Sequence, residues 1–167
     1  AFLDQDPARI DRVVMTNVMG VLRLAHPIGR RMRDRGQGRI LITGSIAGFM
    51  PGTFQVIYNA SKAFLNNFAL GWNEELKDTG VTVTCLMPGP TDTAFFERAG
   101  LLDTPIGQMK NKDDPAMVAR AGYDAMMAGQ AQMTPGLKNK AQATLAEILP
   151  AGLVARTHRQ MAKPENE

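Results

Sequence analysis

The stretch 39–62 constrains the fold of this chain more than any other. It begins with an almost entirely apolar run, 39–43, that stops at Gly44 and Ser45. Such a run is typical of a parallel strand covered on both faces. A glycine-bearing loop follows, and a helix begins near Tyr58. A strand, a loop and a long helix in this order predict an α/β protein with a parallel sheet.

Apolar periodicity predicts the other elements. A first helix begins with Asp6 as N-cap and Pro7 in its first turn, kinks at Pro27 and ends before Gly36. The pattern then predicts a helix over 58–78 and a strand over 81–87. Weaker signals predict a loop or short helices over 91–112, a helix over 114–128 and a strand over 131–134. They also predict a helix over 139–149, a second short helix from 152, and a polar tail over 163–167.

Together these elements predict one domain over residues 1–167, which is long enough for a hydrophobic core. The fold class is α/β, with part of a doubly wound, Rossmann-like parallel sheet in a three-layer α/β/α arrangement. Residues 94–167 are expected to form a helical lid and tail over the carboxyl ends of the strands.

Composition and charge exclude several classes of function. The net charge is only +3, and the arginines of 30–35 lie at a helix end, where cations complement the helix dipole, so we expect no nucleic-acid partner. Cys85 is the single cysteine, which is typical of a cytoplasmic protein without disulfides. His26 and His158 lack ligand spacing, so no metal is expected. The first residues do not have the pattern of a leader and no apolar run is long enough to span a membrane, so we expect neither.

Tyr58 and Lys62 carry the predicted chemistry. They are four residues apart, so they lie on one face of a helix, one turn apart. Ser45 follows the carboxyl end of a strand, where open α/β sheets place their ligands. The ammonium is expected to lower the pKa of Tyr58 by about 3 units from its usual value near 10. Asn17 falls on the apolar stripe of the first helix, where a buried amide needs partners.

Four motifs in this order resemble the short-chain dehydrogenase/reductase family. They are Asn17 in the helix before the strand, Gly44-Ser45 after the strand, Tyr58-x-x-x-Lys62, and Pro88-Gly89-x-x-x-Thr93 after the second strand. The resemblance covers nearly the whole chain. It implies an oxidoreductase that moves a hydride between NAD or NADP and a carbonyl or alcohol.

The resemblance also implies a role for each motif residue. Tyr58 would be the acid/base, Ser45 would hydrogen-bond the substrate oxygen, Asn17 would hold a water that returns the proton, and Lys62 would complete the catalytic set. The cofactor would be held by Tyr58, Lys62, Pro88, Gly89, Thr91 and Thr93. Thr91 stands where the family more usually has valine, so Thr93 is the expected carboxamide contact.

The chain departs from the family pattern at its beginning. The strand, glycine-rich turn and pyrophosphate-binding helix that open a nucleotide-binding member do not precede residue 39. Residues 43–50 imitate such a turn, but Met50 replaces its last glycine and Pro51 follows, so we interpret them as a decoy. We expect a fragment truncated at its N-terminal side, whose exposed apolar edge strand over 39–43 favours a homo-oligomer.

Two other functions suit a fragment that lacks a dinucleotide site. The first is a cofactor-independent ester hydrolase with Ser45 as nucleophile and Lys62 or Tyr58 as base, although residues 43–47 lack the first glycine of a G-x-S-x-G motif. The second is a folded but inactive oligomer. An apolar cluster over the pocket predicts a lipophilic carbonyl or ester substrate; its members are Phe95, Phe96, Leu101, Leu102 and Ile106.

Overall fold

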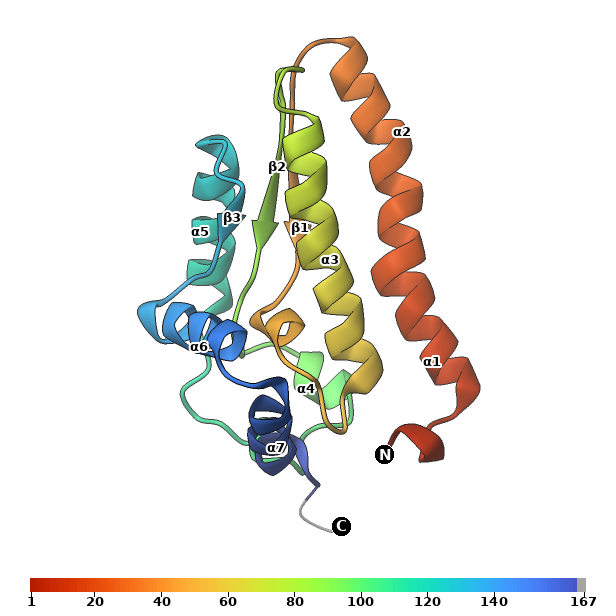
Figure 1. Cartoon of the computed structure of the whole chain (residues 1–167), viewed down its shortest axis with the longest axis vertical. Coiled ribbons are helices and arrows are strands. Elements are labelled where there is room, and N and C mark those ends of the chain that lie inside the picture. Colours follow the sequence, from red (N-terminus) through yellow and green to blue (C-terminus); the bar gives the residue numbers. More distant parts are fainter. Residues whose placement is uncertain (165–167) are drawn as a thin grey trace.

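The computed structural model describes residues 1–164, and it contains a three-stranded parallel sheet at the centre of the molecule (Figure 1). The last residues of the expected tail, 165–167, lie outside the described residues. The strands β1 (Gly38–Thr43), β2 (Val81–Leu86) and β3 (Gln132–Met133) follow one another in space in that order. All three predicted strands are therefore present, and β1 lies at the edge of the described sheet.

The N-terminal helix is interrupted where the sequence predicted continuity. Asp6 caps α1 (Pro7–Val14) by accepting a hydrogen bond from the Ala8 amide at 3.0 Å, as expected. A π-helical turn, η2 (Met15–Met19), then joins α1 to α2 (Gly20–Asp34), after a short 3-10 turn, η1 (Phe2–Asp4), at the start of the chain. Helix α2 continues through Pro27, so the proline does not end the helix, and Asn17 lies within the π-helical turn.

The sheet is the middle of three layers, which confirms the predicted α/β/α arrangement. Helices α2 and α3 (Val56–Glu75) cover one face, and α5 (Pro115–Met127) covers the other (Figure 1). Asp114 caps α5 by accepting from the amides of Ala116 and Met117, as the Asp-Pro pair predicts. Part of the expected lid and tail thus belongs to the sheet layers, because β3 and α5 lie within residues 94–167.

The core forms between the sheet and α3. Its buried members are Ile42, Leu65, Ala69, Leu76, Val81, Val83, Cys85 and Met87. Cys85 is fully buried, and burial raises the pKa of its thiol to about 11, so it is a core residue and not a reactive thiol. Trp72 of α3 lies directly against Gly29 of α2, where a Cβ would overlap the indole ring.

The remaining elements gather at the carboxyl ends of the strands (Figure 1). They are the 3-10 turn η3 (Ile46–Phe49) and the helices α4 (Phe95–Arg98), α6 (Leu137–Ile148) and α7 (Ala151–Ala162). Residues 43–50 therefore do not form a strand–turn–helix unit, since α3 begins only at Val56. Within residues 1–164, no helix combines the length and apolar character needed to cross a membrane.

Candidate active site

A cleft of about 1220 Å³ opens at the carboxyl ends of β1 and β2. This is where an open parallel sheet places its ligands, because successive strands end at the same edge. All of the residues that the sequence predicted for the site line this one cleft: Asn17, Ser45, Tyr58, Lys62, Pro88, Gly89, Thr91 and Thr93. Residues separated by 76 positions in the chain (from 17 to 93) are thereby brought together.

Ser45 is held by a side chain that the sequence analysis did not single out. Its backbone N–H donates to Asn66 Oδ1 at 3.2 Å, and its carbonyl accepts from Asn66 Nδ2 at 2.9 Å. The Ser45 hydroxyl donates to the Pro88 carbonyl at 3.3 Å and accepts from the Ala47 amide at 3.1 Å. The serine is therefore fixed on both its main chain and its side chain.

Tyr58 and Lys62 lie in the first turns of α3, on the side that faces the end of β1. Lys62 Nζ donates to the Thr43 carbonyl at 2.8 Å and lies 5.9 Å from the centroid of the Tyr58 ring. The Tyr58 ring also packs against Phe95, with 5.1 Å between centroids. The cleft therefore brings together a phenol, an ammonium and the end of a strand.

The protonation of Tyr58 differs from the sequence-based expectation. Burial raises the pKa of the Tyr58 phenol above its usual value, and a hydrogen bond with Ser45 lowers it by less. Burial likewise lowers the pKa of the Lys62 ammonium. The expectation that Lys62 lowers the pKa of Tyr58 is therefore wrong for this structure, because desolvation dominates and the ammonium is directed at Thr43.

Asn17 lies within the π-helical turn η2, half-buried at the cleft rather than fully buried among the valines. Its Nδ2 donates to Ser61 Oγ at 3.0 Å, and Ser61 Oγ in turn donates to the Tyr58 carbonyl at 2.7 Å. The amide thus has the partner that a half-buried position requires. It connects the N-terminal helix to the turn of α3 that carries Tyr58.

The loop after β2 is braced from α6. A Cβ at Gly89 would overlap the amide of Asn139, so only glycine fits against this side chain. Asn139 Nδ2 donates to Asp113 Oδ2 at 2.6 Å and to the Pro135 carbonyl at 2.7 Å. Within the loop, the Thr91 hydroxyl donates to the Gly89 carbonyl at 3.0 Å.

Thr93 has a different environment at the end of the same loop. Its hydroxyl oxygen accepts from the amide of Phe95, the first residue of α4, at 3.3 Å. A hydroxyl that accepts in this way still has its own proton to donate. The Thr91 proton, by contrast, is already directed at a carbonyl of the loop.

The apolar cluster predicted over the pocket is largely in place. Phe95, Phe96, Leu101 and Ile106 line the cleft, whereas Leu102 is 57% exposed and does not. The wall of the cleft near α4 is therefore largely apolar.

Asn66, Asn139 and His158 are the positioning residues that sequence reasoning missed. Each is a polar side chain at most 5% exposed on a helix. His158 of α7 directs Nδ1 at the Thr53 carbonyl, 3.1 Å away, and Nε2 at Asn59 Nδ2, 3.4 Å away. The available signal was an amide or imidazole at an inward helical position, the same signal that singled out Asn17.

The geometry does not favour Ser45 as a hydrolytic nucleophile. A general base must lie within hydrogen-bond reach of the nucleophile. Ser45 Oγ donates to a backbone carbonyl, and Lys62 donates to Thr43. Tyr58 is a hydrogen-bond partner of Ser45, but burial raises the pKa of its phenol, so the phenol stays protonated and cannot act as the base. Both ring nitrogens of His158, which also lines the cleft, face Thr53 and Asn59.

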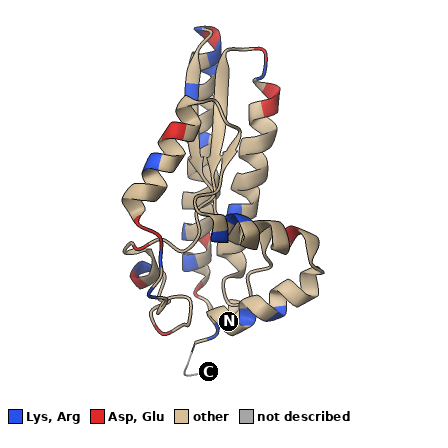
Figure 2. Ribbon diagram, turned by 90° about the vertical axis from the view of Figure 1, so that its left-hand side faces the viewer, with Lys and Arg blue, Asp and Glu red and all other residues tan. Residues whose placement is uncertain are grey.

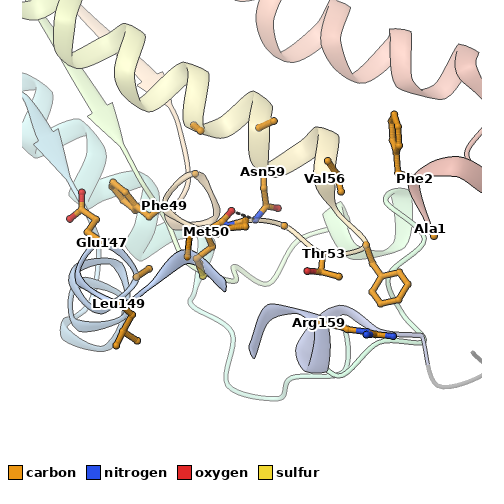
Figure 3. Close-up of a pocket in the computed structure, with 18 residues that line it drawn as sticks. Ala1, Phe2, Phe49, Met50, Thr53, Val56, Asn59, Glu147, Leu149 and Arg159 are labelled. Atoms are coloured by element: carbon orange, nitrogen blue, oxygen red, sulfur yellow. Dashed lines mark hydrogen bonds between the residues drawn. The ribbon is translucent and has the colours of Figure 1, made fainter. Parts of the chain in front are cut away.

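A second cavity, of about 960 Å³, lies against the loop 48–54 (Figure 3). It is mainly apolar and reaches from Phe2 to Leu149 and Arg159. Figure 3 shows Asn59 reaching from α3 toward this loop, where Nδ2 donates to the carbonyls of Ala47 and Met50 at 3.0 and 3.1 Å. Asn59 is the only polar side chain of α3 at this cavity among the described residues, and it serves to hold the loop.

Fold and cleft together define an α/β protein of the Rossmann-like class, with serine, tyrosine and lysine at the carboxyl edge of its parallel sheet. The chain belongs to the short-chain dehydrogenase family, since the family model described as "short chain dehydrogenase" matches residues 1–101. The resemblance drawn from the four motifs is thereby confirmed.

Curated relatives and solved structures agree with this membership. The chain is 37% identical over 103 residues to a very-long-chain 3-oxoacyl-CoA reductase of Neurospora crassa, covering 60% of this chain and 31% of that protein. It is 37% identical over 117 residues to the 3-oxoacyl-acyl-carrier-protein reductase FabG of Aggregatibacter actinomycetemcomitans, covering 66% and 47%. The chain thus spans less than half the length of both relatives.

A short-chain dehydrogenase from Sphingobium yanoikuyae, solved in complex with NADPH, superposes with a TM-score of 0.75 at 26% identity. The match covers 90% of this chain and 61% of the solved one.

Proposed function

We propose that this chain provides the catalytic part of an NAD- or NADP-dependent oxidoreductase that interconverts a lipophilic carbonyl compound and its alcohol. The observation that carries the proposal is the meeting of Asn17, Ser45, Tyr58 and Lys62 with the loop 88–93 in one cleft. The names of the similar proteins, two reductases and a dehydrogenase with NADPH, support the reaction type. A cytoplasmic location is part of the same proposal.

Tyr58 acts as the acid that protonates the carbonyl oxygen. Because burial raises its pKa, the phenol keeps its proton at neutral pH and can donate it during reduction. Ser45 Oγ, which exchanges its bond to the Pro88 carbonyl for one to the substrate, orients the same oxygen. Lys62, held at the end of β1, places a positive charge beside the reacting groups.

Asn17 helps to return a proton to Tyr58 after Tyr58 has protonated the substrate. Its link through Ser61 fixes it at the backbone of Tyr58. In this position, its amide can hold a water at the inner end of the cleft, from which the tyrosine is reprotonated.

The residues present fit the nicotinamide end of the cofactor. Thr93 has a hydroxyl proton to donate to a carboxamide, and Tyr58 and Lys62 offer their polar groups to the ribose. When bound, the nicotinamide supplies or accepts the hydride. A turn for the pyrophosphate is not formed by residues 43–50, because η3 replaces the helix N-terminus that such a turn needs.

Calorimetric titration of the purified chain with NADPH and NADH tests this proposal. We expect binding that is lost in Lys62→Ala and only weakened in Tyr58→Phe, since the first removes the charged ribose contact and the second removes a single neutral hydroxyl contact. Lys77→Ala, an exposed lysine of the same helix region paired with Glu74, is the matched control. Absence of binding by the unmodified chain would show that this chain by itself is not an oxidoreductase.

A third variant, Ser45→Ala, distinguishes the oxidoreductase from the alternative, an ester hydrolase. Ser45→Ala should abolish carbonyl reduction without creating or removing any hydrolysis of short esters. Ester hydrolysis that disappears in Ser45→Ala would instead support the hydrolase.

A further inference from the structure

The cleft that holds Ser45 and Tyr58 is lined by positive charge alone. Four cationic residues line it, namely Arg9, Arg12, Lys62 and Arg98. Of the described residues that line it, none is an aspartate or a glutamate. Over the ribbon as a whole, basic and acidic residues are interspersed (Figure 2). The single sign of charge is therefore a property of the cleft and not of the whole surface.

The arginines reach the cleft from two elements. Arg9 and Arg12 are three residues apart on α1, so they project from the same side of that helix. Arg98 is the last residue of α4. Arg9 Nη2 donates to the carbonyl of Ala99 at 2.6 Å and so ties α1 to the end of α4. All three side chains are exposed, which places them where the cleft meets solvent.

No ion pair within residues 1–164 involves Arg9, Arg12 or Arg98. The ion pairs there join other groups: Ala1 with Asp4, Arg33 with Asp34, Lys77 with Glu74, and Arg120 with Asp124. Charges of one sign in a cleft with apolar walls concentrate the electric field and attract an ion of opposite charge. Guanidinium groups suit carboxylate, sulfonate and phosphate oxygens, which they can bind in pairs.

We propose that Arg9, Arg12 and Arg98 select a carbonyl substrate whose apolar body ends in an anionic group such as a carboxylate. The proposal rests on the oxidoreductase function proposed above and specifies its substrate. The carbonyl meets Ser45 and Tyr58, and the apolar body lies along the wall near α4. The anionic end reaches the arginines at the opening. Lys62 takes no part in this recognition, because the proposed function assigns its ammonium to the ribose of the cofactor.

A pair of probes that differ only in charge tests the proposal. The purified chain is titrated calorimetrically with a straight-chain ω-oxo fatty acid and with its methyl ester, which share the carbonyl and the apolar body. We expect the acid to bind about tenfold more tightly than the ester, the effect of one charge-assisted contact. The preference should shrink as salt is added, because exposed charges are screened.

Substitutions of single arginines test whether these residues cause the tighter binding of the acid. Arg12→Ala and Arg98→Ala should each reduce the preference for the acid, and Arg12→Lys should keep part of it, since it retains the charge but not the fork. Arg120→Ala, which removes an exposed arginine of α5 away from the cleft, is the control and should keep the full preference. Equal affinity for acid and ester, or binding of neither, would overturn the proposal.

Two further outcomes separate this proposal from the one on which it rests. The titration needs no hydride transfer, so a preference for the acid without any oxidation of NADPH would refute the oxidoreductase function and leave an anion-selective cleft. A loss of NADPH affinity in Arg12→Ala, with unchanged affinity for the acid, would instead assign the arginines to the cofactor and overturn the inference.

Discussion

Asn66 gives Ser45 the pairing that a neighbouring strand would otherwise provide. It is 2% exposed, and its amide satisfies both backbone groups of the serine. Asn66→Ala would leave a buried N–H and a buried C=O without partners, so we expect a loss of about 2–4 kcal/mol in the free energy of unfolding. Urea denaturation measures this loss, and carbonyl reduction should fall with it because Ser45 is no longer fixed.

Asn67→Ala is the matched control for this prediction. Asn67 is the next residue of α3, is exposed, and donates only to the Ala63 carbonyl of its own helix. Its replacement should change stability by less than about 0.5 kcal/mol, as is usual for surface positions. Equal losses for the two variants would contradict the proposed role of Asn66.

The sequence predicted which residues meet at the site but not their protonation. Strand ends and helical spacing are local properties, so Ser45, Tyr58 and Lys62 could be assigned to one pocket. The pKa of Tyr58 depends on how much of the phenol is covered, and its cover includes Phe95, which is 37 positions away in the chain (from 58 to 95). Such desolvation cannot be calculated before the fold is known.

The packing of α6 on the loop after β2 makes Gly89 a specific requirement. Gly89→Ala would force a Cβ into the buried Asn139 amide, and overpacking of this kind costs about 1–3 kcal/mol. We expect a lower midpoint of urea unfolding and weaker nicotinamide binding. The double variant Gly89→Ala with Asn139→Ala should recover part of the Gly89 effect, because the obstructing amide is gone. Additive losses would show that the two residues do not interact.

The docking of α7 makes stability depend on pH. Burial lowers the pKa of His158, and its hydrogen bond with the Thr53 carbonyl raises it by less. Since the unfolded imidazole titrates near 6.5, the unfolded chain binds more protons just below that pH. The contribution of His158 to the free energy of unfolding is therefore fully present above about pH 6.5. It is lost as the pH falls through the pKa that His158 has in the folded protein.

Thermal unfolding at a series of pH values measures this effect. His158→Gln, which cannot be protonated, should reduce the decline of Tm below about pH 6.5. His26→Gln removes the exposed histidine of α2 and should keep the decline, because His158 is still present. The same decline in all three proteins would exclude His158 as its cause.

At the scale of the whole molecule, the edge position of β1 predicts self-association. Two of its three apolar residues, Ile40 and Leu41, are only partly buried in the single chain, whereas Ile42 is buried. An unpaired strand edge of this kind favours pairing with another chain. Light scattering over a range of concentrations should give a mass above that of the 18.2 kDa chain. A mass that stays monomeric throughout would contradict the prediction.

The architecture was predictable where apolar periodicity is regular. It was less predictable where the contacts of polar groups determine the local structure. The three layers, both Asp-Pro helix starts and even the short β3 follow from local patterns. The π-helical turn does not, because no residue type within 15–19 marks the position of an extra residue in a helix. The contacts of α6 and α7 with the site also depend on tertiary packing, so no local pattern predicts them.

The turn at Met15–Met19 also determines which way the start of the chain faces. It adds one residue between α1 and α2, and one residue corresponds to about 100° of rotation around an α-helix. Deleting Met15 would restore a regular helix and carry Arg9 and Arg12 away from the cleft, while Ser45 and Tyr58 stay in place. Through this turn, a change in chain length of a single codon would alter how an anionic substrate is held at the opening of the cleft, while the positions of Ser45 and Tyr58 stay the same.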